Sequence, residues 1–178
     1  MTGRREELRA GLDAVRGRID AACAAAGRDP AEVTLVVVTK FFPRTDVDVL
    51  HELGVRDVGE NRDQEAAEKL DPRDRPADLT VHFIGQLQSN KAGSVASYAD
   101  VVHSIDRPKL VPALERGAHR AGRRLAGLVQ VNLDEDAAAG RGGAAPTDVP
   151  ALCETVAGSS LELRGLMAVA PLGVDPRP

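Results

Sequence analysis

The sequence predicts an α/β fold, a (β/α)8 barrel of the TIM type, of which this chain supplies about six of the eight strands. Short runs rich in β-branched residues alternate strictly with helical segments, which is typical of parallel strands joined by right-handed crossovers. Polar residues stand where several of these runs end, at the face where barrel enzymes place their sites. No GxGxxG motif follows the first run, which argues against a doubly wound dinucleotide-binding sheet.

A helix and then a strand are expected at the start of the chain. Leu8, Leu12 and Val15 begin an apolar stripe with three- and four-residue spacing, and Gly27 ends the predicted helix. The run VTLVVVT at residues 33–39 is continuous and β-branched, which predicts a strand buried on both faces.

Five further strands are predicted to alternate with helices along the rest of the chain. The expected strands cover residues 55–58, 79–84, 101–104, 125–132 and 161–167. The expected helices cover residues 47–53, 65–70, 91–98, 108–122 and 148–156. The acidic and then Gly/Ala-rich stretch at residues 134–146 predicts a mobile loop over the barrel mouth.

Composition narrows the class of protein. The length of 178 residues favours a single domain over residues 1–178, and a net charge of -4 with 2% aromatic residues argues against a nucleic-acid partner. The charged amino terminus and the absence of a long apolar run predict no membrane association and a cytoplasmic location. Cys23 and Cys153 form no CxxC pair and no histidine is spaced for a metal, so we expect buried free thiols and no metal site.

Lys40 is the residue with the clearest chemical meaning. It directly follows the apolar run at residues 33–39, so its amine would emerge at the mouth of the strand bundle. A lysine amine in such a place can attack a carbonyl carbon and form a Schiff base. On the pattern alone, a strand-ending lysine that extends into solvent explains the position somewhat better.

Six strings, in this order and at these spacings, resemble the pyridoxal phosphate homeostasis proteins, which have the alanine-racemase-like barrel: VVVTKFFP, VGENRDQE, HFIGQLQSNK, VVHSID, VQVNLDED and LRGLMAVAPLG. The resemblance reaches from the first helix to Leu172. It implies that the cofactor is pyridoxal 5'-phosphate, that Lys40 binds it as a Schiff base, and that the protein balances vitamin B6 without catalysis. It also implies four further cofactor-facing residues, Asn61, Gln86, Asn132 and Met167. Each has an ordinary structural alternative, as a helix cap, a loop anchor or a core residue.

The family continues past the sixth strand with two further units that hold the cofactor phosphate. The resemblance therefore implies a C-terminally incomplete domain whose phosphate-binding residues lie beyond the sequence, and a monomer whose partner is a small-molecule cofactor. Two enzymatic alternatives stay open. A racemase-like enzyme would need a second base, and the only tyrosine is Tyr98 in a predicted helix. A cofactor-free aldolase would use Lys40 on its substrate directly.

Overall fold

The computed structural model describes residues 2–134 and 142–171, and within them six parallel strands form one sheet in the order β1-β2-β3-β4-β5-β6. The strands are β1 (Val37–Val38), β2 (Asp57–Glu60), β3 (Thr80–Phe83), β4 (Val101–Ile105), β5 (Ala126–Val131) and β6 (Glu162–Ala168). The α-helices described are α1 (Thr2–Ala26), α2 (Arg44–Glu52), α3 (Asp63–Lys69), α4 (Ala92–Tyr98), α5 (Leu110–Ala121) and α6 (Val149–Ala157). Short 3-10 helices occur at Pro30–Glu32 and Pro146–Asp148.

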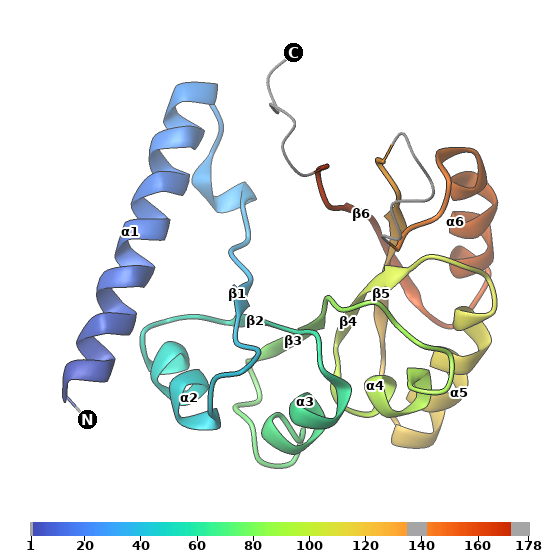
Figure 1. Cartoon of the computed structure of the whole chain (residues 1–178), viewed down its shortest axis with the longest axis horizontal. Coiled ribbons are helices and arrows are strands. Elements are labelled where there is room, and N and C mark those ends of the chain that lie inside the picture. The colour runs from blue at the N-terminus through green and yellow to red at the C-terminus, as the bar shows by residue number, and fades with distance from the viewer. Residues whose placement is uncertain (1, 135–141, 172–178) are drawn as a thin grey trace.

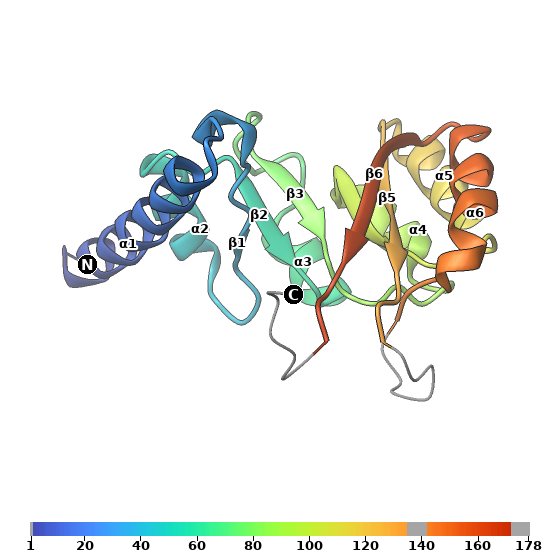
Figure 2. The ribbon, with the colours of Figure 1, turned by 90° about the horizontal axis from the view of Figure 1, so that it is seen from above.

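The sheet curves into an arc whose convex side is covered by helices. Figures 1 and 2 show α2 to α6 along this outer side and α1 beside β1. Each helix from α2 to α6 follows one strand and returns the chain to the start of the next, as right-handed β/α crossovers do. Strands in consecutive order that curve around a common interior have the arrangement of a β/α barrel, which confirms the predicted fold class.

The first strand is shorter and less buried than predicted. Only Val37 and Val38 pair with β2, and the side chain of Val38 is 43% exposed. The prediction of a strand over residues 33–39 buried on both faces is therefore wrong. The physical reason is position, because β1 is an edge of the arc and the described residues place no strand on its outer side.

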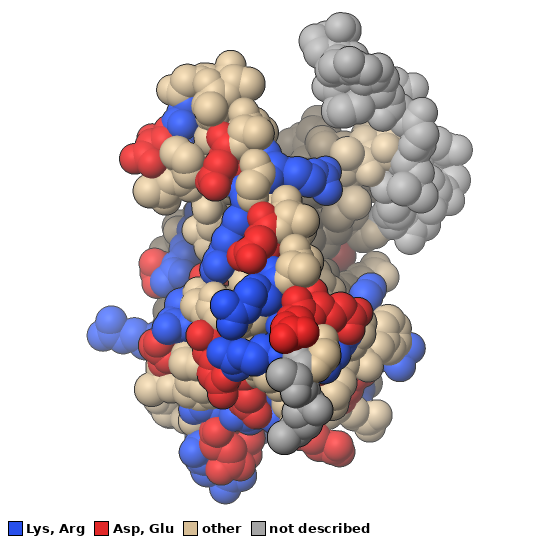
Figure 3. Space-filling model, turned by 90° about the vertical axis from the view of Figure 1, so that its left-hand side faces the viewer, with Lys and Arg blue, Asp and Glu red and all other residues tan. Residues whose placement is uncertain are grey.

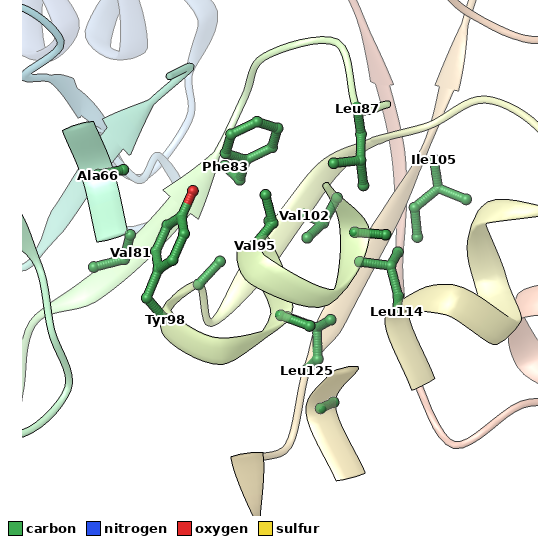
Figure 4. Close-up of a cluster of buried hydrophobic side chains, with 14 of the residues drawn as sticks. Ala66, Val81, Phe83, Leu87, Val95, Tyr98, Val102, Ile105, Leu114 and Leu125 are labelled. Carbon is green, nitrogen blue, oxygen red and sulfur yellow. The ribbon is translucent and has the colours of Figure 1, made fainter. Parts of the chain in front are cut away.

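The main hydrophobic core lies between the convex face of the sheet and the helices. Figure 4 shows Val81 and Phe83 of β3 and Val102 of β4 beside Val95 and Tyr98 of α4. All five side chains are at most 2% exposed. Because the chain has three Phe, one Tyr and no Trp, aliphatic side chains fill most of this core.

The amino-terminal helix packs against α2 and the first 3-10 helix. Its Leu12 and Cys23 are buried, and Arg4 forms an ion pair of 2.5 Å with the buried Asp46 of α2. Figure 3 shows acidic and basic side chains intermixed on the face that α1 forms. Cys23 and Cys153 are both free thiols, as predicted, although Cys153 is only half-buried. Within residues 2–134 and 142–171, no helix has both the length and the apolar character needed to cross a membrane.

Candidate functional site

Lys40 and Asn61 follow the carboxyl ends of the paired strands β1 and β2. Val37 and Val58 are paired and contribute to the helix-side core, so the next pair, Val38 and Gly59, faces the opposite way. Lys40 lies two residues past the end of β1 and Asn61 one residue past the end of β2, and the same alternation, continued to these positions, would turn both toward the concave side. Lys40 is half-buried at the carboxyl end of β1.

Aliphatic side chains surround Gly59 on the concave face. A Cβ atom on Gly59 would lie 3.3 Å from side-chain atoms of both Val36 and Ile84 and 3.4 Å from Val38. Glycine at this point therefore lets β1 and β3 bring their side chains together over β2. Lys40 follows Val38, one of the residues of this apolar surface, by two positions.

Charged side chains from β2 and α3 hold the backbone around Lys40. The Lys69 ammonium donates to the backbone oxygens of Thr39 at 2.9 Å and Phe42 at 3.0 Å, and forms an ion pair with Glu60 at 2.7 Å. Thr39 Oγ1 donates to the same Glu60 carboxylate at 2.6 Å, and Phe41 N–H donates to Glu65 at 2.7 Å.

Sequence reasoning missed Glu60, Glu65 and Lys69. The pair Glu65 and Lys69 does have a signal, because a glutamate four residues before a lysine is a favourable helical spacing. That spacing is ordinary on exposed helix faces. It does not indicate that Lys69 is buried and bonded to a loop 30 residues away.

Asn61 and Gly85 meet where β2 and β3 end. A Cβ atom on Gly85 would lie only 2.6 Å from the backbone oxygen of Asn61 and 2.9 Å from its Cα and Cβ, so the close approach requires glycine. The side-chain oxygen Oδ1 of Asn61 is buried and has no hydrogen-bond partner in the described residues. A buried acceptor without a partner is unfavourable, and a ligand with a donor group would satisfy it.

Gln86 and Asn132 line one hollow at the same end of the sheet, together with Gln130 and Val169. Its volume is about 320 Å³. Asn132 Oδ1 accepts the N–H of Asp134 at 2.9 Å, so this side chain also anchors its own loop. Met167 pairs with Gln130 in the register of β5 and β6, which places the two on the same face. The hollow does not include Lys40, Asn61 or Met167.

A larger hollow of about 460 Å³ lies between α1 and β1. It is lined mainly by apolar side chains, among them Leu8, Leu12 and Val38, and it includes none of the five predicted site residues. Of the predicted loop at residues 134–146, residues 135–141 lie outside the described part of the chain.

Three polar side chains join neighbouring strands deeper on the concave face. His82 of β3 bonds through Nδ1 to His103 Nε2 of β4 at 2.8 Å and through Nε2 to Asp57 Oδ1 of β2 at 2.9 Å. Burial, with a smaller contribution from the neighbouring His82, lowers the pKa of His103 from 6.5 to about 4. The ring of His82 is thus bonded to both neighbouring strands, and His103 is bonded to His82. Within the residues described, no group of three or more His, Cys, Asp and Glu side chains is arranged to hold a metal.

Comparisons with known proteins agree on one family. The family model described as alanine racemase, N-terminal domain, matches residues 11–176. The pyridoxal phosphate homeostasis protein of Mycobacterium tuberculosis is 43% identical, over 97% of this chain and 74% of that relative.

Two solved structures are also similar to this chain. An unknown protein from Bifidobacterium adolescentis has a TM-score of 0.87 and 30% identity, and the match covers 98% of this chain and 74% of that one. PipY of Synechococcus elongatus, solved with pyridoxal phosphate bound, has a TM-score of 0.69 and 34% identity, with 88% and 72% of the two chains covered.

Proposed function

The chain belongs to the family of pyridoxal phosphate homeostasis proteins, with the barrel of the alanine racemase N-terminal domain, and from this premise we propose that it binds pyridoxal 5'-phosphate and takes part in balancing vitamin B6. The observation that carries the proposal is the position of Lys40. Lys40 is half-buried and lies two residues past the carboxyl end of β1, which supports a reactive amine at this end of the sheet.

The side chains near the carboxyl ends of the strands fit the chemistry of the cofactor. Pyridoxal phosphate supplies an aldehyde that a lysine amine can bind covalently. Lys40 would form that Schiff base. Asn61, Gln86 and Asn132 offer amide donors and acceptors for the polar groups of the ring, and Met167 offers an apolar contact. The buried Asn61 oxygen, which no protein group satisfies in the described residues, supports a polar ligand beside it. We assign no residue of this chain to the cofactor phosphate.

We propose that the protein carries the cofactor and does not catalyse a reaction on it. Racemisation needs a base on each face of the substrate. Burial, followed by the nearby carboxylates of Asp63 and Glu60, raises the pKa of Tyr98, whose side chain lies in the helix-side core. The only tyrosine is thus unsuited to proton transfer on the concave face. A racemase-like enzyme remains the second candidate, because the alanine racemase N-terminal domain is the family model that matches.

The remaining parts of the proposal concern setting and assembly. We propose that residues 1–178 act as a single cofactor-binding domain, that the protein is a cytoplasmic monomer, and that its partner is the small-molecule cofactor. Sedimentation of the purified chain with and without pyridoxal phosphate would test the monomer. A dimer in either condition would contradict this part.

Absorption spectroscopy tests the central proposal. Purified protein mixed with pyridoxal phosphate should develop a visible absorption band that borohydride abolishes, and mass spectrometry should then find a pyridoxyl group on Lys40. The Lys40→Ala variant should lack both. Lys109→Ala, which removes an exposed lysine before α5, is the matched control and should retain both. An adduct on other lysines, with none on Lys40, would refute the proposal.

The same sample separates the candidate functions. Loaded protein that racemises free amino acids would favour the racemase-like enzyme over the carrier. Aldol cleavage by the cofactor-free protein, lost in Lys40→Ala, would favour the aldolase.

A further inference from the structure

We propose that Glu65 and Lys69 of α3 are positioning residues that hold Lys40 in the orientation from which its amine reacts. The inference rests on the proposed function, because it concerns the same amine. Neither residue needs to touch the cofactor. Glu65 bonds to the backbone after Lys40, and Lys69 bonds to the backbone before and after it.

The residue after Lys40 has an unusual backbone conformation. Phe41 has a φ of 69°, the left-handed region that bulky side chains rarely adopt. Such a conformation persists only where its surroundings enforce it, and these positions are frequent at functional sites. The backbone N–H of Phe41 donates to Glu65 Oε1 at 2.7 Å. Glu65 therefore holds the peptide group that joins Lys40 to Phe41.

Lys69 holds the chain on both sides of the same point. Its ammonium bonds to the oxygen of Thr39, before Lys40, and to the oxygen of Phe42, after it. Because the Lys69 side chain is only 6% exposed, water has little access to replace these bonds. Glu65 Oε1 lies 3.2 Å from the Lys69 ammonium, so the two positioning residues also bind each other.

The charge of Glu65 suits this role. Partial burial raises the pKa of Glu65. The hydrogen bond from Phe41 N–H and the contacts with Lys69 and Arg62 lower the pKa by more than burial raises it, so it lies below its usual value. The carboxylate is therefore ionised near neutral pH, and hydrogen bonds to ionised groups are stronger than those between neutral ones.

The ring of Phe41 couples this loop to the site. Lys40 Nζ lies 5.6 Å from the ring centroid, and the guanidinium carbon of Arg62 lies 4.4 Å from it. If the backbone of Phe41 left the left-handed region, its ring and the stem of Lys40 would both change direction. Loss of the hydrogen bond to Glu65 should therefore change the position of the Lys40 amine.

The test measures two quantities separately: the rate of condensation at Lys40 and the rate of amide exchange at Phe41. In the condensation, the neutral amine of Lys40 adds to the aldehyde carbon of pyridoxal phosphate, a C=N bond forms, and the aldehyde oxygen leaves as water. Borohydride then delivers hydride to that bond and fixes the adduct for mass spectrometry. Amide hydrogen exchange, measured by NMR without cofactor, reports on the Phe41 N–H itself.

Glu65→Ala is the main variant, because Glu65 is 31% exposed and its loss leaves the buried pair of Glu60 and Lys69 intact. We expect exchange at Phe41 to become about 10-fold faster and adduct formation at Lys40 about 10-fold slower, the effect of losing one charge-assisted hydrogen bond. Glu65→Gln keeps an acceptor and should show a smaller effect on both. Glu68→Ala removes an exposed carboxylate from the same helix and should change neither.

The outcomes distinguish this inference from the proposed function. If the unmodified chain forms no adduct on Lys40, the proposed function fails and the inference fails with it. If the unmodified chain forms the adduct and Glu65→Ala forms it equally fast, or if Phe41 exchange does not change, the inference is overturned while the proposed function stands. Should Glu65→Ala lose its helical circular dichroism, Glu65→Gln replaces it, and unchanged exchange and adduct rates in that variant overturn the inference.

Discussion

Glu60 and Lys69 show how strongly single residues near the site depend on one another. The Glu60 side chain is fully buried, and its nearest cation is the Lys69 ammonium at 2.7 Å. Glu60 Oε2 has no hydrogen-bond partner in the described residues. A buried carboxylate of this kind is tolerated only while its counter-ion is present.

Lys69→Met should therefore destabilise the fold strongly. We expect the free energy of unfolding to fall by about 3–5 kcal/mol, because the change leaves the Glu60 charge buried without a partner. Urea unfolding at neutral pH measures the loss. The double variant Glu60→Gln, Lys69→Met removes both charges and should recover part of it. A double variant less stable than Lys69→Met alone would contradict this explanation.

Gly85→Ala tests the contact between the ends of β2 and β3. The added methyl group would overlap the backbone of Asn61, so we expect a loss of about 1–3 kcal/mol in the free energy of unfolding. Binding of pyridoxal phosphate should weaken as Asn61 is displaced. Gly11→Ala is the control, because nothing lies within 4 Å of its new methyl group and alanine favours the helix by about 1 kcal/mol. If Gly85→Ala and Gly11→Ala changed the free energy of unfolding equally, the predicted overlap between residue 85 and Asn61 would be disproved.

Among the elements, the strands β2, β3 and β4 are joined by the chain of Asp57, His82 and His103. The unfolded protein binds a proton on His103 below about pH 6.5, whereas the folded protein, with a pKa of about 4, does not bind it until lower pH. The unfolded state thus carries more protons between these values. By linkage, stability decreases as the pH falls from about 6.5 to 4 and changes little from this group at lower pH.

This linkage predicts a measurable pH dependence. Urea unfolding should show the free energy of unfolding falling by up to about 3 kcal/mol between pH 7 and pH 4 from His103. His103→Asn should flatten that dependence. His119→Asn changes an exposed histidine of α5 and should leave the dependence as it is in the unmodified chain. If the free energy of unfolding of His103→Asn depends on pH as strongly as that of the unmodified chain, other groups cause the dependence.

The elements also show which parts of the structure a sequence can predict. Periodicity located the six strands and their helices to within a few residues, because it depends on neighbours in the chain. The burial of β1 was mispredicted, since a β-branched run does not indicate whether another strand will lie beside it. The contact of Lys69 with Thr39 was not predicted for the same reason. It joins α3 to a loop far away in the sequence, and local spacing carries no information about such a pair.

At the scale of the whole molecule, the two edges of the arc carry exposed apolar side chains. Val38 of β1 is 43% exposed, Leu166 of β6 is 56% exposed, and Val169, directly after β6, is 55% exposed. The chain covers 74% of the Mycobacterium tuberculosis relative. We propose that the remaining quarter of such a relative, joined after residue 178, would cover these edges and contribute groups that bind the cofactor phosphate.

Titration with pyridoxal phosphate tests this proposal. The joined chain should bind at least about 10-fold more tightly than the 178-residue chain, because each charge-assisted hydrogen bond to a phosphate adds about 1.5–3 kcal/mol. Joining the same residues in scrambled order is the control and should give no gain. Equal affinities for the 178-residue chain and the joined chain would contradict the proposal.

The packing of Tyr98 has a practical consequence. With no tryptophan and a single tyrosine in the chain, ultraviolet emission from this protein arises almost entirely from one phenol ring, which lies on α4 beside Val81 of β3. The emission of Tyr98 therefore reports whether α4 and β3 remain packed together. The absorption of bound pyridoxal phosphate could be measured in the same sample with little overlapping absorption from the protein, and without an attached dye.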